Sequence, residues 1–185
     1  SLKPKRFEDI VALVALIRPG PLGANMHIEF ADRATGKKEI EFLHEDLKAI
    51  LEETYGVILY QEQVMQIAQR ISGFQLDEAD DLRKAMGKKI PKVMEQQRKK
   101  FTDGSIKNGY SEQFSVELFD QIAYFAGYGF NKSHSVPYAL IAYQTAYLKA
   151  NFPAEYLSAC LTAVKRDKER TAVFLAEARD LGVNV

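Results

Sequence analysis

Apolar residues recur at helical spacing along most of the chain. Residues 7–17 are strongly apolar and predict a helix, which the run Arg18-Pro19-Gly20-Pro21 ends because proline and glycine interrupt helices. One apolar stripe lies at 47–51 and stops at Tyr55-Gly56, and a second lies at 64–71 and stops at Ser72-Gly73. These patterns predict a mainly α-helical domain.

The second half of the chain continues this pattern. Pro91 is expected to open a helix that runs to about residue 107, and Ser111 to cap a helix that reaches residue 126. Residues 136–150 are apolar on nearly every side, which predicts a buried helix at the centre of the domain. Two shorter helices are expected at 153–164 and at about 167–181.

Residues 77–86 predict a short helix with acidic first turns and a basic last turn, an order that complements the helix dipole. Gly87 follows this segment and is interpreted as its C-terminal cap.

The strongest β signal lies near the N-terminus. The strings MHIEF (26–30) and KEIEF (38–42) alternate apolar and polar residues around a turn at 32–36, a pattern typical of a hairpin. We therefore expect one small β-hairpin in a multi-helix fold.

The composition favours a folded protein that resides in a reducing compartment. The 185 residues are 46% hydrophobic and 11% aromatic, enough for one domain, or one domain with a small annex. The single cysteine, Cys160, lies among apolar neighbours and is interpreted as a core residue of a cytoplasmic protein. Neither a signal-peptide core nor an apolar run of about 20 residues is present. Because the chain starts without methionine, we expect a domain of a longer protein.

Positive charge is concentrated in one segment, although the formal net charge is zero. The basic run from Arg83 to Lys100 holds eight lysines and arginines against one acid, Glu95. Such a local field suits phosphate, and the alternative is a solvated helix face. In the first part, Arg83 offers a planar fork to phosphate, while the lysines act as point charges. The basic residues there are Arg83, Lys84, Lys88 and Lys89, with Gly87 between them. The cluster at 98–100 suits a nucleic-acid backbone or solvent.

A second phosphate-compatible element is the glycine loop, Gly127 to His134, which leads into the apolar helix. Gly127 and Gly129 permit unusual backbone conformations, and a helix N-terminus favours anions. The loop also supplies donors at Asn131, Lys132, Ser133 and His134. By itself this string is also typical of an ordinary helix-entry turn, and it lacks the P-loop spacing.

Other site chemistry has little support. The three histidines are scattered, without the pairing of a zinc site. The acids between Asp77 and Asp81 lie on one short helix, which favours helix-start charges over a two-metal site. Cys160 has no histidine nearby, and no G-x-S-x-G motif occurs.

Five long motifs occur along the chain: RFEDIVALVALIRPGP (6–21), YQEQVMQIAQRISGF (60–74), DEADDLRKAMGKK (77–89), FAGYGFNKSHSVPYALIAYQTAYLKANFPAEYLSA (125–159) and EARDLGVNV (177–185). Together they resemble one family, the bacterial replicative DNA polymerase III α subunits, which are C-family polymerases. The similarity covers essentially the whole chain and lies in the fingers domain of that family.

The resemblance implies a single fingers domain over 1–185 that closes on an incoming deoxynucleoside triphosphate. It implies a lead-in from the palm at 1–22, the hairpin-like stretch at 23–43, a helical core at 44–164 and a lead-out helix at 165–185. The family's basic residues, which would face the triphosphate, match Arg83, Lys84, Lys88 and Lys89. The glycine loop would lie near the nucleotide and the template–primer end. Residues that either touch substrate or brace the site are Tyr60, Gln61, Glu62 and Gln63.

The reaction implied is attack of a primer 3′-hydroxyl on the α-phosphate, assisted by two Mg²⁺ ions. In the family, palm aspartates that precede this segment hold those ions, so this chain alone is expected to contain no catalytic residue and to be inactive. The implied partners are template–primer DNA, deoxynucleoside triphosphates, the palm, the sliding clamp and other replicase subunits, with no membrane.

Two positions depart from the family pattern. Lys84 stands where a second arginine is common, which keeps the charge but loses the bidentate fork. Pro137 stands where alanine is common, one turn into the apolar helix, and is expected to affect capping rather than chemistry.

Three other interpretations remain open on these residues. A non-catalytic helical module could bind nucleic-acid backbones through the basic run. An error-prone member of the same polymerase family is possible, although AMGKKIPKVM resembles the replicative type. A plain scaffold would use its charges only for solubility.

Overall fold

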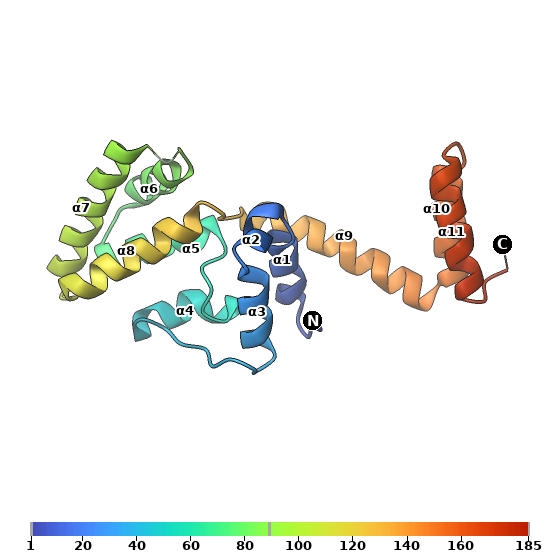
Figure 1. Cartoon of the computed structure of the whole chain (residues 1–185), viewed down its shortest axis with the longest axis horizontal. Coiled ribbons are helices and arrows are strands. Elements are labelled where there is room, and N and C mark those ends of the chain that lie inside the picture. Colours follow the sequence, from blue (N-terminus) through green and yellow to red (C-terminus); the bar gives the residue numbers. More distant parts are fainter. Residues whose placement is uncertain (1, 89, 185) are drawn as a thin grey trace. The chain divides into compact units, whose positions relative to one another are not determined.

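The computed structural model describes residues 2–88 and 90–184, and for residue 126 its backbone alone. The chain divides into two compact units, Ser1–Val136 and Pro137–Val185. Helices dominate both units (Figure 1). Unit 1 contains α1 Phe7–Leu16, α2 Pro19–Gly23, α3 Met26–Ala34, α4 Lys48–Leu51, α5 Gln61–Ser72, α6 Leu76–Lys88, α7 Pro91–Lys107 and α8 Glu112–Ala126, with 3₁₀ turns at Glu45–Leu47 and Glu52–Thr54. Helix α9, Lys132–Asn151, contains the boundary, and α10 Pro153–Val164 and α11 Lys168–Asp180 follow.

The expected β-hairpin is wrong. No strand occurs in residues 2–88 and 90–184, and the segment of the first hairpin arm is helix α3. Met26 and Phe30 also stand four residues apart, so they share one face of a helix, and both are buried. Ile28, which a strand would place on their side, is 49% exposed. A five-residue alternation fits both periods, and packing selects the helix.

Most local signals at helix ends were reliable, with one exception at Gly87. Both α7 and α10 begin at a proline, as expected, and α5 ends at Gly73 with φ of 68°. The Ser111 side chain accepts a hydrogen bond from the Phe114 N–H at 3.2 Å and caps α8. The cap predicted at Gly87 is wrong, because α6 continues through Gly87 to Lys88.

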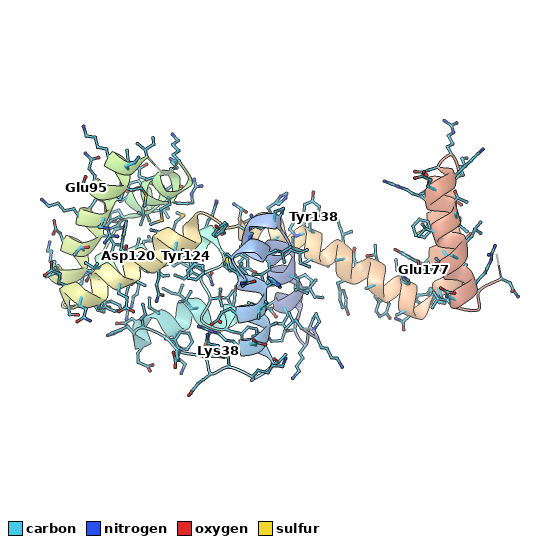
Figure 2. All side chains as sticks on the ribbon, viewed as in Figure 1. Lys38, Glu95, Asp120, Tyr124, Tyr138 and Glu177 are labelled. Carbon is cyan, nitrogen blue, oxygen red and sulfur yellow. The ribbon has the colours of Figure 1, made fainter. Side chains whose placement is uncertain are left out.

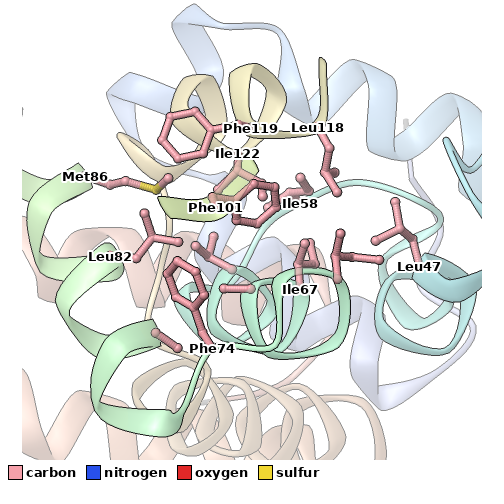
Figure 3. Packing of buried hydrophobic residues seen from close by; sticks show 14 of the residues in the cluster. Leu47, Ile58, Ile67, Phe74, Leu82, Met86, Phe101, Leu118, Phe119 and Ile122 are labelled. Carbon is pink, nitrogen blue, oxygen red and sulfur yellow. The ribbon is translucent and has the colours of Figure 1, made fainter. Parts of the chain in front are cut away.

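The core of unit 1 is built where α5 to α8 pack together (Figure 3). The Phe101 ring lies between those of Phe74 and Phe119, at centroid distances of 6.2 and 5.6 Å. Ile67 and Leu82 are fully buried beside them. This core holds α5 and α6 in a fixed relation, and these two helices position most of the candidate site.

Helix α9 forms over the predicted segment, but its expected burial is wrong in the described part of the chain. Tyr138, Ile141 and Tyr147 are 55%, 57% and 51% exposed, and Tyr138 projects from the ribbon in Figure 2. Pro137 lies inside this helix, as its expected place one turn after the helix start implies. Cys160 on α10 is half-buried, so it is not the fully buried core residue expected.

Candidate functional site

The first turn of α5 divides into bracing and exposed residues. Gln63 is buried, and its side-chain oxygen accepts hydrogen bonds from the N–H groups of Leu59 and Tyr60 at 2.8 and 2.9 Å. Its amide nitrogen donates to the Thr54 hydroxyl at 2.8 Å. Tyr60 is also buried, and this burial raises the pKa of its hydroxyl. Tyr60 and Gln63 therefore brace the start of α5, whereas Gln61 and Glu62 remain partly exposed.

The glycine loop pairs with the chain just before α5. The N–H of Phe130 donates to the carbonyl oxygen of Leu59 at 3.1 Å, and the N–H of Gln61 donates to that of Phe130 at 2.9 Å. These bonds form an isolated parallel bridge between Tyr60 and Phe130. Gly127 has φ of −62°, so the glycine freedom expected at this position is not used. The loop is therefore held by its backbone.

Arg18 holds the same loop from another side. Its guanidinium donates to the carbonyl oxygens of Tyr128 and Ala15 at 2.6 and 2.7 Å. It also lies over the Phe130 ring, 4.6 Å from the centroid. Burial lowers the pKa of the Arg18 guanidinium. The Phe130 ring in turn lies 5.6 Å from the His134 ring. A series of contacts thus joins Arg18 to the exposed end of the loop.

A carboxylate of the protein itself, that of Glu62, contacts the N-terminus of α9. The Glu62 carboxylate accepts from the Lys132 N–H at 3.0 and 3.1 Å. The Lys132 ammonium contacts Glu53 at 2.6 Å and lies 5.6 Å from the centroid of the Tyr60 ring. Asn131 caps the helix by accepting from the His134 N–H at 2.8 Å. The Lys132 ammonium and the N–H groups of Lys132 and His134 are therefore engaged within unit 1, while the residues Ser133 and His134 are exposed.

On α6, the first basic residues share one carboxylate. Arg83 and Lys84 each contact Asp80 at 2.7 Å. The hydrogen bond from Lys84, followed by that from Arg83, lowers the pKa of Asp80. Lys88 is exposed and makes no ion pair with any residue that the structure describes. Lys89 lies outside the described residues. This end of α6 therefore carries a positively charged surface, and Asp80 neutralises part of that charge.

Gln61 connects α6 to the glycine loop. Its side-chain oxygen accepts from Arg83 at 3.4 Å, and its amide nitrogen donates to the Gly129 carbonyl oxygen at 3.5 Å. Both distances are long, so each bond is weak. They nevertheless place Arg83 beside the loop, which joins the two phosphate-compatible elements of the sequence at one edge of unit 1.

The second part of the basic run has a structural role. Arg98 forms an ion pair with Asp120 and lies 5.2 Å from the centroid of the Phe119 ring. Lys100 contacts Glu78 at 2.8 Å and lies over the ring of Phe74. These two residues link α7 to α8 and to α6. Asp120 projects from α8 in Figure 2.

Three residues that hold the site were missed from the sequence as site residues. Arg18 was interpreted as part of a helix stop, Asp80 as a helix-start charge, and Glu53 was not singled out. Each contacts a predicted site residue or the loop. The one sequence signal for Arg18 was its place between an apolar helix and a Pro-Gly turn.

In residues 2–88 and 90–184, no group of three or more His, Cys, Asp or Glu side chains is arranged to hold a metal ion. In the same residues, no helix has both the length and the apolarity to cross a bilayer.

Comparison with known proteins places these features in a family context. Residues 1–109 match the family model for the bacterial DNA polymerase III alpha subunit finger domain. The whole chain is 50% identical to DNA polymerase III subunit alpha of Mycobacterium tuberculosis (strain ATCC 25618 / H37Rv) over 188 residues. It is 50% identical to the subunit of that name from Escherichia coli (strain K12) and 51% identical to the one from Vibrio cholerae serotype O1, over 189 residues each. The chain spans 16% of the length of each relative.

Proposed function

Since this chain belongs to the family of bacterial DNA polymerase III alpha subunit finger domains, we propose that its α6–loop edge binds the triphosphate of an incoming deoxynucleotide. The edge consists of Arg83, Lys84 and Lys88 on α6 together with the glycine loop. Lys89 is included in the proposal from its sequence position alone.

The observation that carries the proposal is the contact of Arg83 with Gln61, whose amide reaches Gly129. It supports one surface shared by the basic end of α6 and the loop. An arginine fork and nearby ammonium groups suit a triphosphate, which carries several charged oxygens. Ser133 and His134 are exposed at the loop end of this surface, where they can contact the nucleotide or the primer end.

In the proposed reaction, the parent enzyme joins the nucleotide to a primer 3′-hydroxyl, with loss of pyrophosphate. The role of this chain is to bind and orient the triphosphate and to balance its negative charge. Template–primer DNA, the palm, a sliding clamp and other replicase subunits are the proposed partners of the parent.

The divalent metal ions of a polymerase, proposed to be Mg²⁺, do not fit the acids of this chain. Asp80 is engaged by two cations, and the described residues contain no cluster of potential ligands. We therefore assign the ions to palm carboxylates outside the chain and assign no metal-dependent step to these residues.

Steady-state primer extension by the intact parent enzyme tests the proposal. Arg83→Ala and Lys88→Ala should each lower kcat/KM for nucleotide by about tenfold or more, since a hydrogen bond to a charged group contributes about 1.5–3 kcal/mol. Lys99→Ala is the matched control, because Lys99 is an exposed cation on α7.

An unchanged kcat/KM in both α6 variants would remove Arg83 and Lys88 from the nucleotide site. Reduced DNA affinity at low salt with normal use of nucleotide would instead favour backbone binding by a helical module.

A further inference from the structure

The glycine loop has two anchors that the basic run and the loop sequence do not include. Arg18 contacts the loop at Tyr128 and Phe130, and Glu62 contacts it at Lys132. The three contacted residues span the middle of the loop. Both anchors are partly buried. The Arg18 guanidinium is engaged by carbonyl oxygens of the protein, and Glu62 is negatively charged, so neither offers a positive group to an anionic ligand.

Each anchor determines the position of a residue proposed to face the nucleotide. The Arg18 guanidinium fixes the Phe130 ring, and that ring contacts His134. The Glu62 carboxylate fixes the first N–H of α9, so it determines where the helix begins and where Ser133 and His134 stand on its first turn.

The space around Tyr128 restricts the loop further. A Cβ atom added to Gly20 would lie 2.8 Å from the Tyr128 ring, so the turn that follows Arg18 packs against the loop without room for a side chain. The anchor at Arg18 therefore belongs to a tightly packed contact, and the loop lacks the space to shift toward α2.

From these contacts we propose that Arg18 and Glu62 are positioning residues, which hold the glycine loop in the conformation that binds the nucleotide. The inference rests on the proposed nucleotide site. It assigns to Glu62 the anion position at the α9 N-terminus, so the triphosphate is bound chiefly by α6 and by the exposed loop side chains.

Nucleotide kinetics of the intact parent enzyme test this inference. Arg18→Lys keeps the charge but lacks the fork needed to contact Tyr128 and Ala15 while covering Phe130. Glu62→Ala removes the carboxylate, whereas Glu62→Gln keeps one acceptor oxygen. We expect Arg18→Lys and Glu62→Ala to raise KM for nucleotide about tenfold with a smaller change in kcat, since small displacements of a binding group are costly. Glu62→Gln should recover part of this loss.

The double variant gives the sharper result. If both residues act through one loop, Arg18→Lys combined with Glu62→Ala should raise KM by less than the product of the single effects. Arg166→Lys and Glu52→Gln are matched controls at exposed positions. Circular dichroism at the assay temperature confirms that each variant is folded.

Unchanged KM in the single variants, or effects that multiply in the double variant, would overturn the inference. The Arg83→Ala measurement separates the two failures. If Arg83→Ala is impaired while the Arg18 and Glu62 variants are normal, only the positioning role fails. If Arg83→Ala is normal as well, the nucleotide site itself is wrong.

Discussion

The ammonium of Lys132 lies 2.6 Å from a carboxylate oxygen of Glu53, a residue 79 positions earlier in the chain. Both side chains are about one third exposed, at 37% and 35%. The pair links the start of α9 to the 3₁₀ turn at Glu52–Thr54. Lys132 was expected to face phosphate, so its partner determines how its substitution should be interpreted.

We expect Lys132→Met and Glu53→Gln to weaken nucleotide use in the parent enzyme by similar factors, because either change removes the same contact. An exposed ion pair contributes up to about 1 kcal/mol, which corresponds to about fivefold in KM. Glu52→Gln, one residue away and exposed, is the control. A large effect of Lys132→Met beside a normal Glu53→Gln would show that Lys132 contacts the substrate directly.

Two glycines in neighbouring helices should respond in opposite ways to alanine. A Cβ on Gly104 of α7 would overlap the carbonyl oxygen of Ser72, at the end of α5, and would lie 3.2 Å from the Ser72 Cβ. Gly104→Ala should therefore destabilise unit 1 by about 1–3 kcal/mol, the usual cost of overpacking. Gly87 lies inside α6, and beyond its own helix no atom of the described residues lies within 4 Å of an added Cβ. Gly87→Ala should stabilise the chain by about 0.5–1 kcal/mol.

Urea unfolding of the two variants and the unchanged chain measures both effects. Equal midpoints for the two variants would contradict the close approach of α5 and α7 at Gly104.

These examples also explain which parts of the structure the sequence could predict. Helix boundaries at Pro91, Pro153 and Gly73 depend on the conformation of the residue itself, and they were predicted correctly. The contacts that hold the loop depend on residues far apart: Arg18 lies 110 positions from Tyr128, and Glu62 lies 70 from Lys132. No local pattern encodes such a pairing. The loop was therefore predicted as an anion site, and the Glu62 carboxylate that already contacts it was missed.

Acid should weaken the junction between α1 and the 3₁₀ turn at Glu52–Thr54. Burial of Asp9 alone would raise its pKa, but hydrogen bonds from the Lys5 N–H, the Tyr55 hydroxyl and Arg6 outweigh burial, so the pKa is lowered from 3.8. Because the folded-state pKa is the lower one, the stabilisation is fully present above the unfolded value. It is lost as the pH falls through the folded value.

Urea unfolding at a series of pH values tests this expectation with Asp9→Asn. The variant should be less stable than the unchanged chain at neutral pH, and the difference should shrink below pH 3.8. Asp103→Asn, an exposed position on α7, should follow the unchanged chain throughout. A constant difference across the acid range would show that ionised Asp9 does not stabilise the fold.

Helix α9 gives a prediction about the parent enzyme. An apolar side chain at every turn is typical of a helix that is covered on all sides, yet Ile141 is 57% exposed in the described chain. Ile141→Ser should therefore cost no more than about 0.5 kcal/mol in this chain, as is usual for surface positions. In the intact parent, where further polypeptide is available to cover the helix, we expect a loss of about 2 kcal/mol or more, the usual cost of emptying a buried aliphatic site.

Unfolding midpoints of both proteins, each compared with its unchanged form, measure the two costs. Lys165→Ser, an exposed position just after α10, controls for a general effect of serine on this unit. Equal small costs in the two proteins would mean that α9 keeps this face exposed in the parent as well.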